Sequence, residues 1–342
     1  AAINATVAGV VSCAALSGKV DHIYGAVNGI EGVLAEKFLD LGKKLDSAEK
    51  ISLLMQTPAA ALGSCRYKLG DPEENKEDFE EILQIFRRHE IRYFIYIGGN
   101  DSMDTVDKMS KYCKENGVDD VFVVGAPKTI DNDVWGTEMT FGFQSAVDIA
   151  TEVIDCIHTT ATSHGRIFIV EVMGHKVGWL NLYAGIAGGA DIILLPEIPY
   201  DINEIAKVIE KREQAGKRFS ILAVAEGAIS KEEAKMKKKE LKALRASMPY
   251  PSISYKIAKE LEEVTGHEIR VTVPGHFQRG GSPCAYDRFL CTRFGAAAAR
   301  LIKNEQYGFM VALQNEKIVP VPLGEVAGKL KKVPVDSDII EA

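Results

Sequence analysis

The sequence predicts an α/β fold with mostly parallel sheets that are covered by helices on both faces. Short, almost entirely apolar runs alternate along the chain with longer segments of helical pattern, and this alternation is typical of parallel strands joined by crossover helices. The chain has 342 residues. Because a single hydrophobic core stops growing at roughly 250–300 residues, this length predicts two domains.

Six runs are predicted to be strands because each is almost continuously apolar, as expected for strands buried on both faces. They are Ile91–Ile97, Asp120–Gly125, Arg166–Val172, Asp191–Leu195, Phe219–Ala225 and Glu268–Val273. Helical patterns separate them, and Ala1–Asn4 already has the pattern of a helix. The predicted helices are Asn75–His89, Ser102–Asn116, Phe141–Thr162, Asn203–Gln214, Ser252–Val264 and Pro283–Lys303.

The composition argues against several classes of protein. The net charge of −7 is unfavourable for general nucleic-acid binding. The longest apolar stretches, such as Ile91–Ile97 and Val121–Ala126, are far too short to span a membrane, and the first residues show no secretory signal pattern. The six cysteines include no Cys-x-x-Cys pair, which favours free thiols in a reducing compartment. We therefore expect a cytoplasmic protein without a nucleic-acid or membrane partner.

Segments rich in glycine, acids and bases come after nearly every predicted strand. In parallel α/β folds, ligands bind at the carboxyl ends of the strands, so these segments are the candidates for a functional site. They are Gly98–Asp101, Pro127–Asp133, Met173–His175, Glu226–Gly227 and Pro274–Gly281.

The segment Gly98–Asp101 comes after a predicted strand and opens a predicted helix. Glycines allow a phosphate to approach the backbone, and a helix N-terminus offers free N–H groups to it. A tight strand-to-helix turn without a ligand explains the glycines equally well. The acid at Asp101 would repel an anion placed directly against it.

The segment Pro127–Asp133 is more specific, because it holds a lysine, a threonine and two acids within seven residues. Phosphoryl transfer to an alcohol needs a base for the hydroxyl proton, a cation for the developing charge and usually Mg²⁺. Asp131 can be the base, Lys128 the cation, and Asp133 a metal ligand or an orienting group. The alternative is a surface turn rich in Asp and Asn.

Three further groups are candidates for substrate contacts. We favour a substrate contact for His175, because Gly174 leaves room beside it at a strand end. Glu226 can accept hydrogen bonds from sugar hydroxyls or cap a helix, and the residues leave this open. Arg270 and the run Pro274–Gly281 favour phosphate binding over a surface ion-pair cluster, because glycines flank the basic side chains.

Together, these segments resemble the phosphofructokinase family in their residues, order and spacing, over essentially the whole chain. The resemblance implies two Rossmann-like three-layer domains with mostly parallel sheets and a sugar phosphate bound between them. It implies a phosphoryl-donor domain at 1–142, rejoined by about 276–305, and a fructose 6-phosphate domain at 143–275, rejoined by about 306–342. The motifs are Gly-Gly-Asn-Asp-Ser (98–102), Pro-Lys-Thr-Ile-Asp-Asn-Asp (127–133), Glu-Val-Met-Gly-His (171–175), Ala-Glu-Gly (225–227) and Gly-His-Phe-Gln-Arg-Gly-Gly-Ser-Pro (275–283).

The resemblance also assigns roles by position. Asp131 would accept the proton of the sugar's 1-hydroxyl, with Lys128 and Asp101 as the other catalytic positions. Arg166 and Arg270 would reach the sugar phosphate from a neighbouring subunit, which implies a homo-oligomer, a dimer or tetramer, with a shared site. The other substrate-binding positions are Thr129, Ile130, Met173, Gly174, His175, Glu226, His276 and Arg279. The donor-phosphate positions are Gly98, Gly99 and Arg66, and Mg²⁺ would be held at Asn100 and Asp133.

Two positions indicate the phosphoryl donor. Family members that use ATP usually have glycine where Asp101 and Lys128 stand, whereas members that use pyrophosphate have Asp and Lys. An aspartate would occupy and repel the position of a nucleotide's α-phosphate, and a lysine meets the charge of the transferred group. The sequence therefore predicts reversible transfer from pyrophosphate to fructose 6-phosphate, a glycolytic step giving fructose 1,6-bisphosphate and phosphate. The alternatives are an ATP-dependent 6-phosphofructokinase or a non-catalytic regulatory subunit of the same fold.

Three features depart from the family pattern. Asn100 stands where the family often has a magnesium-binding Asp, and a neutral amide attracts Mg²⁺ less. His175 replaces a common Arg and holds less charge at neutral pH. The family's first strand and its Gly-Gly-x-x-Pro-Gly turn, which binds the donor phosphate, are not seen here; Ala1–Ala5 resembles the segment that comes after that turn.

Overall fold

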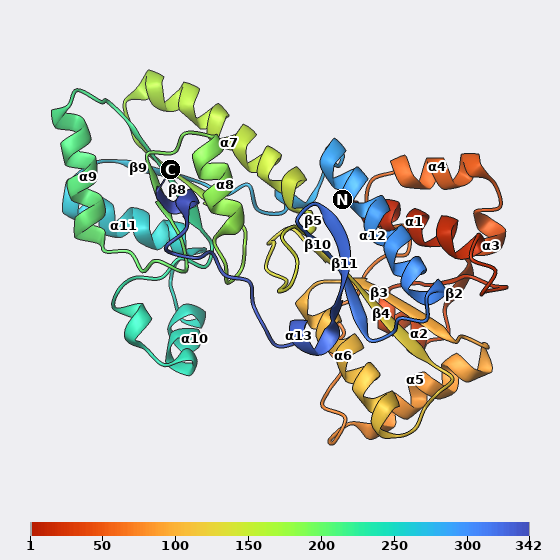
Figure 1. Ribbon diagram of the computed structural model, residues 1–342. Helices are drawn as coiled ribbons and strands as arrows, with labels where there is room; N and C mark the ends of the chain where they lie inside the picture. The colour runs from red at the N-terminus through yellow and green to blue at the C-terminus, as the bar shows by residue number, and fades with distance from the viewer. Residues whose placement is uncertain (1, 342) are drawn as a thin grey trace. The chain divides into compact units, whose positions relative to one another are not determined.

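The computed structural model describes residues 2–341, and the chain divides into two compact units (Figure 1). The first unit comprises Ala1–Thr129, Asp133–Gly142 and Gly281–Lys331. The second comprises Ile130–Asn132, Phe143–Gly280 and Lys332–Ala342. The predicted α/β class with mostly parallel sheets is confirmed. No helix within residues 2–341 has the length and apolar character needed to cross a membrane.

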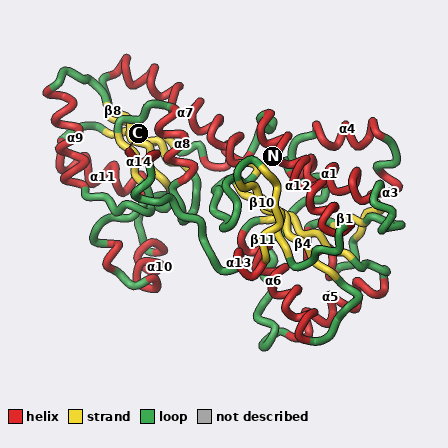
Figure 2. The backbone as a smooth tube through the Cα atoms, in the orientation of Figure 1, coloured by secondary structure: helices red, strands yellow, loops and turns green. Residues whose placement is uncertain are grey.

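The first unit is built on a sheet in the strand order β11-β10-β4-β3, and the short strand β5 pairs with the end of β4. Strand β4 runs parallel to β3, β5 and β10, and β10 forms an antiparallel hairpin with β11. Figure 2 shows these strands in yellow among the helices of the unit. Their bounds are β3 (Tyr93–Gly98), β4 (Phe122–Thr129), β5 (Phe141–Gly142), β10 (Phe309–Gln314) and β11 (Lys317–Pro322).

Both faces of this sheet are apolar, because side chains of successive strand residues point to opposite faces. Val123 and Met310 join the core formed with α5 and α6, whereas Val124 and Val311 join the core formed with α1 and α12. This double burial explains why the strands are continuously apolar in sequence. The helices and small strands of the unit are α1 (Ile3–Ala15), α2 (Gly29–Leu34), α3 (Leu41–Lys44), α4 (Ala48–Gln56), α5 (Lys76–Arg88), α6 (Asn100–Glu115), α12 (Ala285–Lys303), α13 (Leu323–Val326), β1 (Tyr24–Ala26) and β2 (Phe38–Asp40).

The second unit has a fully parallel sheet in the order β7-β8-β6-β9. One face packs on α9 and α11 through Leu222 and Val224 of β8, and Gly185 of α8 packs on Ala223 of the other face. The elements are β6 (Ile167–Val172), β7 (Ile192–Leu194), β8 (Ser220–Ala225), β9 (Ile269–Thr272), α7 (Phe143–His164), α8 (Trp179–Ala187), α9 (Ile202–Gln214), α10 (Lys238–Ala246), α11 (Ile253–Thr265), α14 (Asp338–Glu341) and the 3₁₀ helices η1 (Glu233–Lys235) and η2 (Gly275–Arg279).

The structure differs from the sequence expectations at the end of β4 and at the C-terminal end of the first unit, where β10 and β11 were not predicted. The strand expected at Asp120–Gly125 continues to Thr129, because β3 pairs with Ala126 and Pro127 and β5 pairs with Lys128 and Thr129. The C-terminal segment that rejoins the first unit was expected to end at about residue 305. It extends to Lys331, because β10 and β11 join the first sheet.

A close crossing of α1 and α12 depends on two glycines. A Cβ on Gly295 would lie 2.1 Å from the carbonyl oxygen of Thr6, and one on Gly9 would lie 2.6 Å from that of Thr292. Both neighbours are helix backbone, which cannot move away as a flexible side chain can. The two helices can therefore lie this close only without side chains at positions 9 and 295.

We predict that Gly295→Ala destabilises the protein by about 1–3 kcal/mol, because the added methyl group forces α1 and α12 apart. The measurement is the thermal unfolding midpoint. Gly324→Ala is the matched control, since its Cβ would come no closer than 3.7 Å to Asp107. Equal midpoints for the two variants would contradict the role given to the helix crossing.

Candidate active site

The carboxyl end of β3 and the start of α6 form the predicted glycine turn. Gly98 ends β3, Gly99 is the N-cap of α6, and the helix begins at Asn100. A Cβ on Gly98 would lie only 2.0 Å from the Oγ atom of Ser102. Only glycine at position 98 leaves room for Ser102, and the turn leads directly into a helix N-terminus, where unpaired N–H groups favour anions.

Lys128 lies beside this turn in the first unit. Gly98 pairs with Pro127 in the parallel register of β3 and β4, and a Cβ on Gly99 would lie 3.3 Å from the carbonyl oxygen of Lys128. Gly98, Gly99, Ser102 and Lys128 line one cavity of about 580 Å³, which continues along the whole of β3. The predicted phosphate turn and the predicted cation thus share one edge of the sheet.

Asp101, in the first turn of α6, forms an ion pair that was not predicted from sequence. Its Oδ1 atom lies 3.1 Å from the Nζ atom of Lys68, and about two thirds of each side chain is exposed (69% and 68%). The hydrogen bond from Lys68 to Asp101 raises the pKa of the lysine. Arg66, an exposed residue two positions earlier, belongs to the same segment. The sequence signal that could have pointed to Lys68 was its position two residues after the basic residue Arg66.

Asn100 has a side-chain oxygen suited to a hard cation. Its Oδ1 atom is buried and accepts no hydrogen bond within the described residues. An amide oxygen is an acceptable ligand for Mg²⁺, which usually keeps several waters and substrate phosphates as its other ligands. No cluster of three or more His, Cys, Asp or Glu residues that could hold a metal occurs in residues 2–341. The donor set fits a metal shared with a bound phosphate better than an all-protein cage.

The turn that carries Asp131 connects β4 to the loop before β5. Asn132 is buried and has a φ of 54°, a left-handed conformation that Asn tolerates better than most residues. Thr140 donates a hydrogen bond from Oγ1 to the carbonyl oxygen of Thr129 at 2.9 Å. Asp133 is also buried. The turn is therefore held at both ends, and Asp131 itself is half-buried.

In the second unit, the segments after β6 and β8 meet through Glu226. Its Oε1 atom accepts hydrogen bonds from the backbone N–H groups of His175 at 2.6 Å and Gly174 at 3.2 Å. His175 has a φ of 52°, a conformation that is uncommon for residues other than glycine. A Cβ on Gly227 would lie 2.1 Å from the carbonyl oxygen of His175. The carboxylate thus holds the His175 turn, a role beyond the two that were considered from sequence.

The 3₁₀ helix η2 joins the same edge of the second sheet through Gln278. Its Oε1 atom accepts a hydrogen bond from the N–H group of Met173 at 3.2 Å, and its Nε2 atom donates to the carbonyl oxygen of Gly275 at 3.1 Å. Gln278 is only 1% exposed. It therefore attaches the helix that carries His276 and Arg279 to the end of β6. Gln278 lies within a motif that was recognised in the sequence, but no role was predicted for it.

Comparison with known proteins identifies the family. A family model described as Phosphofructokinase matches residues 1–302. The chain belongs to the phosphofructokinase family. The predicted resemblance is therefore confirmed at the level of the family.

Named relatives of this phosphofructokinase chain differ in the donor that their names give. The chain is 48% identical over 287 residues to the ATP-dependent 6-phosphofructokinase of Spirochaeta thermophila, covering 82% of this chain and 76% of the relative. It is 41% identical to ATP-dependent 6-phosphofructokinase 3 of Bacteroides thetaiotaomicron, with 99% and 93% covered. Its fold matches the crystal structure of a pyrophosphate-dependent phosphofructokinase from Nitrosospira multiformis with a TM-score of 0.85 and 27% identity, covering 99% and 85%.

Arg166 and Arg270, which the family resemblance assigned to the sugar phosphate, lie at the amino end of the second sheet. Arg166 precedes the first residue of β6, and its Nε atom lies 3.0 Å from Oε2 of Glu268, which also pairs with Arg270. A cavity of about 130 Å³ lined by Arg166, Glu268 and His267 lies at this amino end. Glu226 and His175 lie beyond the carboxyl ends of six-residue strands, roughly 20 Å away. Within one chain, the two arginines do not join the Glu226 cluster.

The predicted residues therefore form separate groups on the described chain. The first unit brings together Gly98, Gly99 and Lys128, with Asp101 in the adjoining helix. The second unit brings together Met173, Gly174, His175, Glu226 and η2, whereas Arg166 and Arg270 form their own cluster. The catalytic and binding roles of all these residues remain predictions.

We predict that Glu226→Leu speeds amide hydrogen exchange at Gly174 and His175 by at least ~10-fold, because hydrogen bonds to a charged acceptor contribute about 1.5–3 kcal/mol. The measurement is residue-resolved exchange by NMR. Glu226→Gln is the matched control, since its amide oxygen can still accept. Unchanged exchange in Glu226→Leu would show that the carboxylate does not hold the turn.

Proposed function

We propose that this chain transfers a phosphoryl group to the 1-hydroxyl of fructose 6-phosphate. One observation carries the proposal: the glycine turn follows β3, and Lys128 at the end of β4 leads directly to Asp131, at the carboxyl ends of two paired parallel strands. Phosphoryl transfer needs this combination of an anion-binding backbone, a cation and a carboxylate base. Membership of the phosphofructokinase family supports the choice of acceptor.

In the proposed reaction, Asp131 accepts the proton of the 1-hydroxyl as its oxygen attacks the terminal phosphorus of the donor. A new C–O–P linkage forms, and the bond from that phosphorus to the bridging oxygen breaks, so the remaining donor leaves as an anion. Lys128 and the N–H groups at the start of α6 stabilise the charge on the transferred group. Mg²⁺, when bound through Asn100 and the donor phosphates, would supply further neutralisation of that charge.

Two donors are proposed, each on its own observation. The names of the curated relatives, at 48% and 41% identity, support ATP. The side chain of Asp101 in the first turn of α6, together with Lys128, supports pyrophosphate, because a carboxylate there would repel and obstruct a nucleotide's inner phosphate. The name-based support for ATP is at least as strong as the residue-based support for pyrophosphate.

The donor is decided by assaying the wild-type protein side by side with pyrophosphate and ATP. The argument from Asp101 predicts turnover with pyrophosphate, and that Asp101→Gly raises kcat/KM for ATP by at least ~10-fold, because it removes both bulk and charge.

Asp101→Asn serves as the control for charge alone, since it keeps the size of the side chain. ATP turnover in the wild-type protein with none from pyrophosphate would assign ATP as the donor. An Asp101→Gly variant with unchanged ATP kinetics would refute the blocking role of Asp101.

We also propose that the active site is shared between subunits of a homo-oligomer. The proposal rests on the position of Arg166 and Arg270, at the amino end of the sheet whose carboxyl end carries Glu226. A symmetric dimer can bring the arginines of one chain to the sugar phosphate held by the other. This gives two basic groups to a substrate anion that the chain alone would hold with His276 and Arg279.

We predict that Asp131→Asn lowers kcat by at least ~10²-fold, because the reaction loses its general base. Mixing this variant with an equally inactive Arg270→Ser variant after dissociation should restore about a quarter of wild-type activity, since about half of randomly formed dimers are mixed and each has one intact site.

The measurement is initial rate against mixing ratio, with each variant mixed with itself as the control. Activity that stays at the level of the single variants would exclude a shared site. Wild-type turnover that survives Asp131→Asn would instead favour another base or a regulatory role for this chain.

A further inference from the structure

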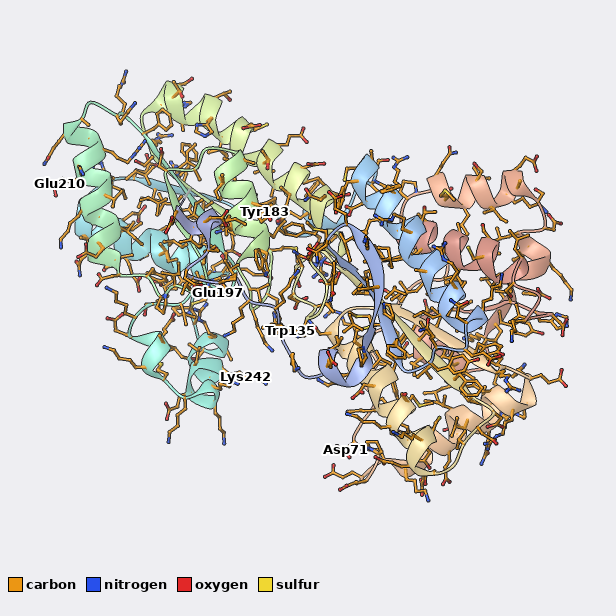
Figure 3. The ribbon with its side chains drawn as sticks, viewed as in Figure 1. Asp71, Trp135, Tyr183, Glu197, Glu210 and Lys242 are labelled. Atoms are coloured by element: carbon orange, nitrogen blue, oxygen red, sulfur yellow. The ribbon has the colours of Figure 1, made fainter. Side chains whose placement is uncertain are left out.

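The C-terminal segment of the first unit runs beside the residues immediately after the Asp131 turn. Leu330 and Val134 form an antiparallel bridge, and the N–H group of Lys331 donates a hydrogen bond to the carbonyl oxygen of Asp133 at 2.9 Å. One residue earlier in this segment, the Nζ atom of Lys329 lies 5.9 Å from the ring centre of Trp135, which is labelled in Figure 3. Residues about 200 positions apart in sequence are therefore paired along their backbones.

The side chain of Lys331 enters the loop that this pairing creates. Its Nζ atom donates hydrogen bonds to the carbonyl oxygens of Thr137 at 2.8 Å and Glu138 at 2.9 Å. Burial lowers the pKa of Lys331 to about 7, against the opposing influence of the carboxylates of Asp133 and Glu138. Burying an ammonium group is costly, so its hydrogen bonds to the loop are what make this position tolerable.

The other side of the same loop is fixed by the end of β10. The N–H group of Glu138 donates to the carbonyl oxygen of Leu313 at 2.9 Å, and the N–H group of Leu313 donates to Oγ1 of Thr137 at 3.0 Å. Gln314 donates from Nε2 to the carbonyl oxygen of Gly136 at 2.8 Å. The loop is thus clamped between β10 and Lys331.

The clamped loop at 133–138 restricts the position of the turn that carries Asp131. The chain leaves β4 at Thr129, passes through Asp131 and the clamped loop, and returns in β5, which pairs with Lys128 and Thr129. Only one residue, Asn132, separates Asp131 from Asp133, whose carbonyl group is bonded to Lys331. A displacement of the loop is therefore transmitted to Asp131 within two peptide units, and a displacement of about 1 Å at a reacting group can cost ~10²-fold in rate.

We propose that Lys331 is a positioning residue for Asp131, acting through the loop at 133–138 and not by touching the substrate. This inference rests on the proposed function, because it assumes that Asp131 is the base. Lys331 fixes two backbone carbonyls and borders Asp133, for which the sequence allowed either a metal ligand or an orienting group. The backbone hydrogen bond from Lys331 to Asp133, together with the influence of the Asp133 carboxylate on the pKa of Lys331, favours the orienting role for Asp133.

The experiment compares Lys331→Met, which keeps the length of the side chain without its donors, with Lys332→Met as the matched control on an exposed neighbour. We expect Lys331→Met to lower kcat by ~10- to 100-fold with both KM values within ~3-fold, and Lys332→Met to leave the kinetics unchanged. Lys331→Arg, which keeps the donors, should recover part of the lost kcat.

A second measurement, independent of turnover, is amide hydrogen exchange over residues 133–140, which should be faster in Lys331→Met and normal in Lys332→Met. If Lys331→Met does not fold, Lys331→Leu takes its place, since it also lacks the donors. A folded Lys331→Met or Lys331→Leu protein with wild-type kcat would overturn the inference, as would an effect on KM alone. Wild-type protein without turnover on either donor would instead refute the proposed function, so the two failures are distinguishable.

Discussion

The pairing of β5 with the end of β4 is the constraint on which the candidate site depends. The pairing with β3 holds β4 as far as Pro127, and β5 extends the sheet to Lys128 and Thr129, beyond the end that the apolar pattern alone suggested. Because Phe141 and Gly142 pair with Lys128 and Thr129, the lysine stays in register with the glycine turn of β3. The same pairing brings the chain back to the end of β4 after the loop that carries Asp131. Lys128 and the glycine turn are thus tied to one end of the sheet by backbone hydrogen bonds, and Asp131 comes two residues after β4.

In the second unit, side chains and not an added strand hold the candidate residues in place. Glu226 holds Gly174 and His175 in a conformation that His175 would not adopt readily by itself, and Gln278 attaches η2 to Met173. Buried side-chain acceptors that satisfy backbone N–H groups make such turns rigid. A carboxylate in this position is therefore doubly constrained, because any contact with a sugar must be compatible with its support of the turn.

Much of this arrangement was predictable from sequence, for identifiable reasons. Buried parallel strands are continuously apolar, so all six predicted strands were found. The motifs after them made Asp131, Lys128 and Glu226 candidate site residues, and their roles stay predictions. β10 and β11 were not predicted, and β4 was predicted to end at Gly125 instead of Thr129. Both errors arise because strand pairing depends on partners distant in sequence. Lys68, Gln278 and Lys331 were missed for the same reason. Their significance lies in contacts with Asp101, Met173 and the loop after Asp131, which no local pattern encodes.

The ion pair between Asp101 and Lys68 determines how firmly the side chain of Asp101 is held beside the proposed donor site. An exposed pair of this kind contributes only about 0–1 kcal/mol, so Lys68 neither anchors Asp101 nor cancels its charge. Under the proposed function, any obstacle to a nucleotide would therefore come from the carboxylate of Asp101 itself and not from its pairing with Lys68. Selectivity that depends on one exposed side chain in the first turn of a helix can change without altering the core.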